Sequence, residues 1–429
     1  MRNGWKVAAL ALGCVFANAG SAGADWLDTL FPAGVPGYGT EPGVTVTSRL
    51  RPETQPEGVR DGAFILHPAW EQSVGYDSNV LGGPAPVGSW EVGTRPSLLV
   101  ASDWSRDALG AYVAADDRRD LEAPAQSRTD WTASLGGSLD IGRDRLTLAI
   151  AHIANHEDRT QLDALPTDRP VPFQVDDMRV SYAWLAGRWT VTPTLDASSW
   201  HYDATSILGA PASQAYRDRI VLLGGTTVSY ELAPQRTLVF VTRGIGQDYT
   251  HPSPGAASLN STGIQALAGF DYDDDAVWRY RLLLGAEHRA FAAAAYPART
   301  AAIAEGEVAW LPTGLTTVTA SLTRSVEDAA QQGTAGFTQT TAKLTVDHEL
   351  QRDLLLHAYA GLQHADFLQG GTQQTSATFG FGATWLVNRW VQLSGTYDYT
   401  MQRGAATTAL PISGDYTRSL ALVTLRFGL

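Results

Sequence analysis

The feature that most constrains this chain is an alternation of apolar and polar residues that recurs from about residue 63 to the C-terminus. In residues 278–287 the even positions are apolar, whereas Arg279, Arg281 and Glu287 stand at odd positions. A two-residue period is typical of a β-strand whose two faces meet different surroundings. The alternating segments run for about 10 to 14 residues, roughly twice the length of an ordinary strand in a soluble sandwich, and this length suits a tilted crossing of a bilayer.

The composition excludes the other broad classes of protein. Only 17% of the residues are charged and Lys occurs only as Lys6 and Lys343, so a typical soluble surface is missing. A hydrophobic content of 44% argues against disorder. After residue 24, no uncharged apolar run approaches the roughly 20 residues that a membrane-spanning helix needs. The net charge of -13 gives the chain no reason to bind nucleic acid.

The first 24 residues predict a secretory signal peptide. Arg2 and Lys6 form its positive start, residues 7–17 its apolar core, and residues 22–24 a small-residue cleavage site. The only cysteine, Cys14, lies inside this segment, so we expect the mature chain to have neither disulfides nor a thiolate metal site. Residues 25–62 are rich in Pro and Gly, and we interpret them as a periplasmic extension or a short plug.

The remaining residues, 63–429, are predicted to form one transmembrane domain. We count 18 strands, with 16 as the alternative, and their links alternate between short turns and long polar loops. This alternation is typical of an outer-membrane barrel, with the short turns and both chain ends on the periplasmic side. The predicted fold is therefore all-β, a closed, antiparallel, up-and-down transmembrane β-barrel. The strand centres are expected near residues 70, 95, 112, 135, 150, 180, 195, 223, 242, 266, 283, 306, 321, 343, 360, 380, 395 and 422.

Tryptophan placement supports a membrane location. Aromatic side chains gather at both headgroup levels of a bilayer because one part of the ring is apolar and the other is wet. One ring of interface aromatics is expected beside the short turns, and a second ring, including Trp200, Tyr202 and Tyr416, toward the long loops. The members of the first ring are Trp104, Trp184, Trp189, Trp278, Trp310, Trp385 and Trp390.

Several stretches near the start of the barrel resemble a known family. They are residues 58–68 (GVRDGAFILHP), 74–80 (VGYDSNV), 102–106 (SDWSR), 129–131 (TDW), 140–144 (DIGRD) and 156–159 (HEDR). In this order they resemble the putative beta-barrel porin 2 family, specifically over about residues 45–160. The resemblance implies an outer-membrane barrel in a group some of whose members accompany exopolysaccharide production, and it supplies no catalytic residues.

The inward faces of the strands carry the candidate pore-lining residues. A water-filled wall of separated charges and a set of cross-strand ion pairs that stabilise the wall are both open interpretations. The two signs nearly balance, so strong ion selectivity is not expected. Arg243, Arg279, Arg281 and Arg289 form the most concentrated basic patch, which could attract anionic solutes or an acidic polysaccharide. The candidate lining residues are Arg219, Arg243, Arg279, Arg281, Arg289, Glu287, Glu305, Glu307, Lys343 and Asp347.

The loop at residues 156–175 is the longest acidic loop. Its carboxylates could bind a divalent cation, but they lack a regular ligand spacing, and we expect the loop instead to fold inward and narrow the pore. No histidine belongs to a local catalytic motif, so neither catalytic residues nor a metal or cofactor are predicted.

The sequence therefore predicts a porin-like channel in the outer membrane of a Gram-negative bacterium. It is expected to pass hydrophilic solutes, with a possible association with exopolysaccharide export. The alternative is a plugged structural barrel whose extracellular loops bind a partner. The expected partners are outer-membrane lipid, the outer-membrane assembly machinery, and a hydrophilic solute or polysaccharide. Monomer and trimer are both left open.

Overall fold

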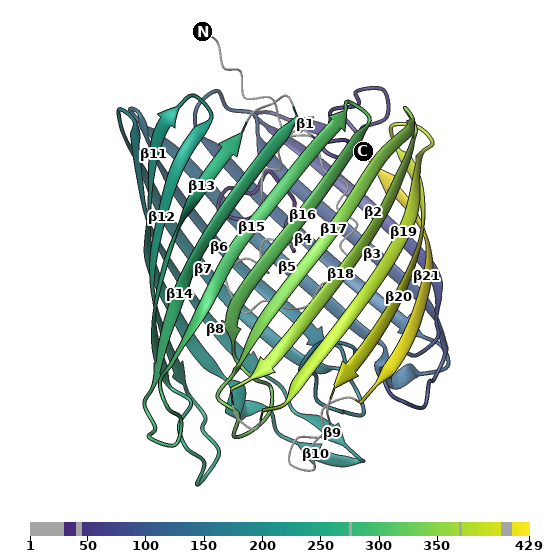
Figure 1. Cartoon of the computed structure of the whole chain (residues 1–429). Coiled ribbons are helices and arrows are strands. Elements are labelled where there is room, and N and C mark those ends of the chain that lie inside the picture. Colours follow the sequence, from purple (N-terminus) through teal and green to yellow (C-terminus); the bar gives the residue numbers. More distant parts are fainter. Residues whose placement is uncertain (1–29, 40–44, 274–276, 369–370, 405–413) are drawn as a thin grey trace.

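The chain folds into one closed antiparallel β-barrel (Figure 1). The computed structural model describes residues 30–39, 45–273, 277–368, 371–404 and 414–429. Within them, nineteen strands form one sheet, of which β1 (Val59–Asp61) is a short strand that pairs with the start of β2. The other eighteen each pair with the next along the chain, and β2 pairs with β21 over Ala69–Asp77 to close the wall. The predicted barrel of 18 strands is confirmed, and every predicted strand centre lies within an observed strand.

The barrel strands are β2 (Phe64–Asp77), β3 (Ser89–Ser102), β4 (Ala108–Asp120), β5 (Arg128–Ile141), β6 (Asp144–Glu157), β7 (Val171–Ala186), β8 (Trp189–Tyr202), β11 (Arg219–Ala233), β12 (Arg236–Tyr249), β13 (Ser261–Asp273), β14 (Trp278–Phe291), β15 (Arg299–Thr313), β16 (Thr316–Glu327), β17 (Phe337–Gln351), β18 (Leu354–Phe367), β19 (Gln373–Leu386), β20 (Val391–Gly404) and β21 (Tyr416–Gly428). The loops carry two short strands, β9 (Thr205–Ile207) and β10 (Ala210–Ala212), and two 3₁₀ turns, η1 (Pro124–Gln126) and η2 (Ala215–Arg217). Among the described residues, no helix has the length and apolar character needed to cross a membrane.

The alternation in the sequence becomes the two faces of this wall. On β14, Leu282 and Leu284 are 44% and 70% exposed on the outside. Leu283 and Glu287, at odd positions of the same strand, are 1% and 0% exposed and point inward. Because side chains of a strand alternate between its faces, one pattern supplies both an apolar outer surface and a partly polar interior.

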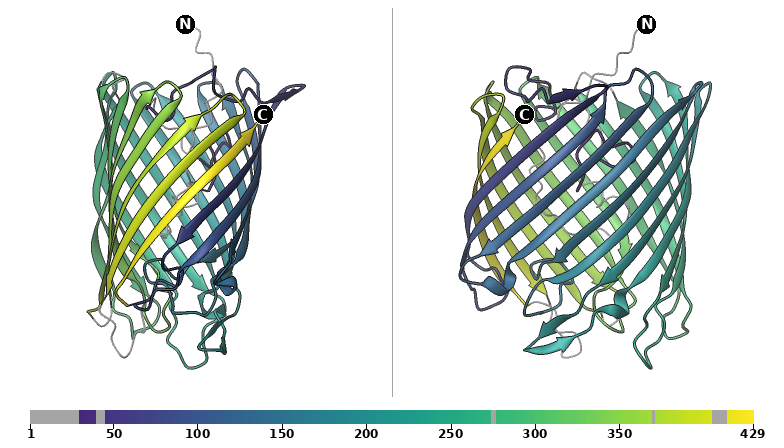
Figure 2. Two further views of the ribbon diagram at one scale, coloured as in Figure 1. Left: turned by 90° about the vertical axis from the view of Figure 1, so that its right-hand side faces the viewer. Right: turned by 180° about the vertical axis from the view of Figure 1, so that it is seen from behind.

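Short turns and long loops lie at opposite ends of the barrel, as expected. The turns at residues 142–143 and 187–188 join their strands directly, and Gly142 and Gly187 take positive φ angles of 67° and 65° there, which a residue without a Cβ adopts easily. The links at the other end are longer, and Figure 2 shows the β9–β10 hairpin projecting beyond the strand ends on that side. Strand β21 ends, and β2 begins, at the short-turn end.

The aromatic residues divide between the two faces. The seven tryptophans expected beside the short turns are 39–53% exposed on the outer surface. Three residues expected in the second outer ring differ: Tyr202 and Tyr416 are each 4% exposed, and both line the interior together with Trp200. In β8 the outward positions are odd up to Ser199, so Trp200 and Tyr202 fall on the inner face.

The described N-terminal residues contact the inner face of the barrel. Phe31, Val35 and Tyr38 form a buried apolar cluster with side chains of β3–β8, such as Tyr112 and Ile153. Farther along the chain, Val46 packs against Leu355 and Leu386, and residues 49–51 reach the end of β17.

Candidate functional site

The barrel encloses a cavity of about 610 Å³. Its lining comes from many strands: Glu71 and Arg426 lie toward the short-turn end, whereas Trp200 and Asp328 lie toward the long loops. The lining therefore combines carboxylates, guanidinium groups and aromatic rings within one interior space. A cavity with such a lining can accommodate a small polar molecule.

The loop between β6 and β7, residues 158–170, folds into the barrel mouth and reaches the opposite wall. The Tyr416 hydroxyl donates to the Thr160 carbonyl over 2.9 Å, and the Asp163 amide donates to Gln374 Oε1 over 2.9 Å. Leu162 packs against the buried pair Phe337 and Phe367. The loop thus narrows the mouth, as expected from its length. Strand β6 ends at Glu157 and β7 begins at Val171, so the loop is shorter than the predicted 156–175.

Asp163 is a buried residue of this loop whose carboxyl pKa is strongly raised. Its carboxylate accepts a hydrogen bond from the Ala330 amide at 2.5 Å, and its other oxygen is buried without a partner in the described structure. Burial raises the pKa of Asp163 to about 7, since the hydrogen bond from Ala330 and the charge of Arg217 only partly offset the loss of water. Asp163 also has a positive φ of 62°, which is uncommon for a residue with a side chain.

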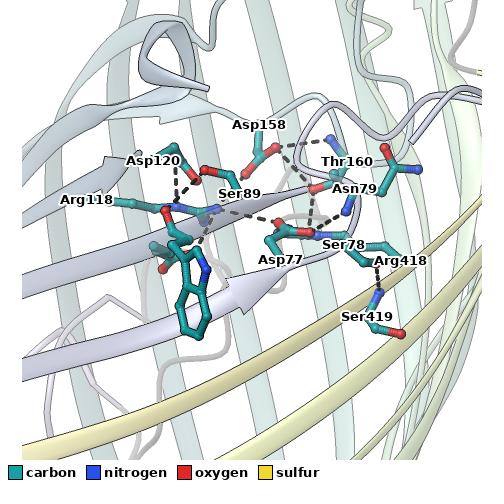
Figure 3. A network of polar contacts seen from close by, with 12 residues as sticks. Asp77, Ser78, Asn79, Ser89, Arg118, Asp120, Asp158, Thr160, Arg418 and Ser419 are labelled. Carbon is teal, nitrogen blue, oxygen red and sulfur yellow. Dashed lines mark hydrogen bonds and ion pairs between the residues drawn. The ribbon is translucent and has the colours of Figure 1, made fainter. Parts of the chain in front are cut away.

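A first arginine network joins four strands at the base of this loop (Figure 3). The Asp77 side chain is fully buried, and the Arg418 guanidinium donates to it with Nη2–Oδ2 and Nε–Oδ2 distances of 2.6 and 2.8 Å. Arg118 lies on the other side of the Asp77 carboxylate, at 3.7 Å, and pairs with Glu91 at 2.9 Å. Arg418 also donates to Thr160 Oγ1 over 3.1 Å, so the network holds the inward loop.

Asp158 ties the start of the loop to the same network. Its carboxylate lies 3.2 Å from Arg128 and 4.0 Å from Arg118. Burial alone would raise the pKa of Asp158, but Arg128, together with the two arginines of the network, outweighs burial and holds that pKa below its usual range.

A second arginine network lies across the mouth. Arg217 forms two hydrogen bonds of 2.6 Å with Glu157, the bidentate geometry that suits a guanidinium. Arg219 and Arg289 share Asp328 at 3.2 and 3.0 Å, and Arg289 also pairs with Glu287 at 2.8 Å.

Aromatic rings shield the second network. The Arg217 guanidinium lies 4.0 Å from the centre of the Tyr202 ring, and that of Arg219 lies 4.7 Å from the Trp200 ring. Cation–π contacts of this kind suit arginines that are cut off from water. They account for the inward placement of the two aromatic residues.

The predicted basic patch is divided among ion pairs. Arg289 belongs to the second network, Arg243 pairs with Glu305, and Arg281 lies 3.5 Å from Asp271. These contacts favour the cross-strand interpretation of the charges over a free basic surface. Arg279 stands beside them on the inner face of β14, and Glu307 on that of β15.

Lys343 and Asp347 lie on the inner face of β17. The Lys343 ammonium is 4.9 Å from the centre of the Tyr359 ring, and Asp347 is 2.7 Å from His357 Nδ1. Tyr359 in turn donates a hydrogen bond of 2.7 Å to Asp398.

The acidic loop forms no cation site in the described structure. Asp158 pairs with arginines, Asp163 accepts from Ala330, and Asp168 accepts from the amides of Leu208 and Gly209. The three carboxylates are thus engaged by separate nitrogen donors.

Arg118 and Asp120 of the first network are not among the lining residues predicted from the sequence. They belong to the segment DDRRD, residues 116–120, which has the composition of a polar loop, whereas β4 continues to Asp120. The inward parity of β4, with Gly110, Tyr112 and Ala114 buried, would have placed Arg118 on the inner face had the strand been extended. Asp328 lies just beyond β16, where no strand parity applies.

Three solved structures are similar to this chain at low sequence identity. The Pseudomonas aeruginosa protein OpdK, solved with vanillate, is 12% identical with a TM-score of 0.47, over 85% of this chain and 99% of its own. OccK9 (OpdG) from the same organism is 10% identical with a TM-score of 0.47, over 85% and 98%. The ferric-catecholate receptor Fiu from E. coli K12 is 10% identical with a TM-score of 0.44, over 87% and 82%. Likeness at this level bears on neither substrate nor mechanism.

The family comparison extends over nearly the whole barrel. No curated protein shows significant similarity to the chain. The model of the family described as putative beta-barrel porin 2 matches residues 51–427, from before β1 into the last strand. Together with the closed barrel and its charged interior, this match points to a channel rather than an enzyme. The chain belongs to the putative beta-barrel porin 2 family.

Proposed function

We propose that this protein is an outer-membrane channel for small hydrophilic solutes. The observation that carries the proposal is a closed wall that is apolar outside and encloses a charged cavity of about 610 Å³. Water-soluble molecules would travel through this interior, since its guanidinium and carboxylate groups keep it wet.

The outer surface supports the membrane location. Large apolar side chains such as Leu284, Phe381 and Ile264 are 63–70% exposed around the wall. A soluble protein rarely exposes such an area, whereas lipid tails would cover it. Outer-membrane lipid and the assembly machinery that inserts barrels are therefore the partners that we propose, together with the solute.

The interior charges support weak ion selectivity. Most of the arginines described above pair with a carboxylate inside the barrel, as Arg418 does with Asp77 and Arg217 with Glu157. Paired charges leave little net field along the path. The family description names no polysaccharide, so the expected link to exopolysaccharide export is not part of this proposal.

Planar-bilayer recordings test the proposal. The purified protein is refolded, and its folding is checked by the shift in gel mobility on heating. Discrete conductance steps with little preference for cations over anions are expected. A folded preparation that gives no steps would overturn the open channel.

A plugged barrel that binds a partner through its loops is the second candidate. The inward loop 158–170 and the N-terminal contacts with the inner wall favour it. A conductance that appears only after one of these segments is deleted would support this alternative.

A further inference from the structure

A row of polar side chains crosses five neighbouring strands of the wall, β16 to β20, which lie side by side (Figure 1). Each member stands directly opposite the next in the antiparallel register, so neighbours are within reach of each other. We call these residues the outer row. They are, in order, Arg324, Thr340, His364, Thr375 and Arg403.

The outer row faces outward from the barrel. Side chains of a strand alternate between its two faces, and apolar residues of the same parity as the row are 37–51% exposed on all five strands. Thr317 of β16, which has the opposite parity, is 0% exposed and contacts Val46 inside the barrel. The exposed apolar residues are Leu322, Leu344, Leu362, Phe379 and Leu393.

The wall next to the outer row, on the side of the short turns, is apolar. Its residues stand two positions away on each strand and are again directly opposite one another. Acyl chains that covered this part of the wall would end in headgroups at the outer row. The residues are Leu322, Ala342, Leu362, Ala377 and Met401.

The outer row runs obliquely toward the long loops. Arg403 is the last residue but one of β20, whereas Arg324 lies three residues before the end of β16. The strands lean so that the row approaches the long loops from β16 toward β20 (Figure 1). Since strands are about 4.8 Å apart and tilted by about 40°, the row is roughly 19 Å long and Arg324 lies roughly 12 Å deeper than Arg403. A lipid-facing arginine at that depth is costly unless an anion reaches it.

Hydrogen bonds join neighbours in the outer row but leave its guanidinium groups open to further acceptors. Arg324 donates from Nε to a carbonyl of β15 over 3.1 Å and from Nη1 to Thr340 Oγ1. His364 Nδ1 lies 2.8 Å from Thr375 Oγ1. In the described part of the chain, neither Arg324 Nη2 nor the Arg403 guanidinium has a hydrogen-bond partner. Because a guanidinium carries five N–H donors, both groups can bind an acceptor from outside the protein.

No carboxylate of the described residues pairs with the outer row. Neither Arg324 nor Arg403 forms an ion pair within this part of the chain. Asp415 lies beside the end of β20, but its carboxylate accepts from the Gly404 amide over 3.0 Å. Asp366 stands nearer the loops than the row, at an exposed position of β18.

Other outward cations toward the long loops have an acid beside them. Arg119 is the last residue but one of β4, as Arg403 is of β20, and it donates from Nε to Asp117 Oδ2 over 2.9 Å. On β6, His152 Nδ1 lies 2.7 Å from Asp176 Oδ1. The outer row differs from these sites because its two arginines carry uncompensated charge.

We propose that the outer row binds the phosphate of an anionic membrane lipid in the leaflet at the long-loop end. The inference rests on the proposed membrane location and not on conduction. Phosphate oxygens would accept charge-assisted hydrogen bonds from the guanidinium groups, while the acyl chains lie against the adjacent apolar wall. A basic residue at the membrane surface raises the affinity for anionic lipid by about fivefold.

The test identifies the lipid beside the outer row. Leu362→Cys in a Cys14→Ser background gives a single thiol next to His364, at an outward position that is 47% exposed. Val113→Cys gives a matched thiol on β4, at a position that is 46% exposed. A fluorophore on the thiol is quenched by brominated acyl chains that lie against it. Vesicles at low salt contain brominated phosphatidylglycerol in plain phosphatidylcholine, or brominated phosphatidylcholine in plain phosphatidylglycerol, at matched lipid ratios.

The quenching at position 362 should give a local preference for phosphatidylglycerol of at least about fivefold, with none at position 113. Arg324→Gln combined with Arg403→Gln should bring the preference close to one. Arg119→Gln is the matched control, because it removes an outward arginine that already has its own carboxylate, and it should leave the preference unchanged. Added salt should weaken the preference, since exposed charges are screened.

The outcomes separate the lipid site from other occupants and from the channel. Equal quenching by the two lipids at position 362, or a preference that survives in the double variant, overturns the site. Quenching at position 113 but not at 362 would assign the face to a protein partner instead, and displacement of the lipid by inorganic phosphate, beyond the effect of equal ionic strength, would assign it to a free anion. A folded protein that is silent in bilayers but keeps the preference would remove the proposed channel and leave the lipid site standing.

Discussion

Substitution of Asp163 by asparagine should abolish a pH response of the inward loop. Asp163 is 4% exposed, accepts a hydrogen bond from Ala330 and has Glu157 and Arg217 as its charged neighbours. Burial raises its pKa to about 7 in the packed loop, against 3.8 for an unperturbed group. The packed loop therefore holds a proton that a released loop has lost, and its packing weakens as the pH rises between these two values.

The size of the effect follows from the two pKa values. Each pH unit inside the window changes the packing free energy by up to about 1.4 kcal/mol. Between pH 5 and pH 8 the loop should lose about 2.5 kcal/mol of packing free energy, or about 80-fold in its packing equilibrium, and little more above pH 8. In the Asp163→Asn variant the side-chain amide oxygen would still accept the Ala330 hydrogen bond, but the amide cannot ionise. Packing of the variant loop should therefore not depend on pH through this position.

Single-channel recordings at pH 5 and pH 8 measure the response. Wild type is expected to show more frequent transitions to a larger conductance at pH 8, because the loop leaves the mouth more often. The Asp163→Asn channel is expected to behave alike at both pH values. The reasoning is refuted if Asp163→Asn keeps the full pH dependence of the wild type, because another group would then be responsible.

Three further predictions concern the stability of the refolded barrel, measured by guanidinium unfolding in lipid vesicles. Arg418→Met should cost about 3–5 kcal/mol, because it leaves the buried Asp77 carboxylate without its closest partner, whereas outward Ser419→Ala should cost under about 0.5 kcal/mol; equal losses would contradict the network. Leu284→Arg, on a side chain 70% exposed at the middle of β14, should cost about 2–4 kcal/mol if lipid covers this face, and no loss would argue against that. Gly142→Val, at a φ of +67°, should cost about 1–2 kcal/mol through backbone strain alone, and a neutral result would show that the turn relaxes.

The strands of the barrel were predicted from the sequence better than the side chains that lie inside it. The period of two and the alternation of loop lengths are local signals, so the strand number and the ends of the barrel followed from them. The facing of Trp200 and Tyr202 was predicted wrongly from their place near a strand end, where aromatic residues suit either a lipid interface or an arginine in the mouth. The parity of β8, whose outward positions are odd, places both rings on the inner face.

Contacts between distant segments were beyond the sequence. The expectation for residues 25–62 left a periplasmic extension and a plug open, and no periodicity could show that Gly110 and Gly136 lie side by side under Pro36. Likewise, the ion pair between Asp77 and Arg418 joins the first and last strands of the barrel, which meet only because the wall closes. Such pairings depend on closure and register rather than on any local pattern.

Swelling of proteoliposomes tests the central claim most directly, because it measures passage of an uncharged solute rather than of ions. Vesicles containing the refolded protein are diluted into an isosmotic solution of a small neutral sugar or of a large dextran. The account predicts rapid swelling in the sugar and none in the dextran, with protein-free vesicles silent in both. Folded protein that gives no swelling in the small sugar would contradict a channel for hydrophilic solutes.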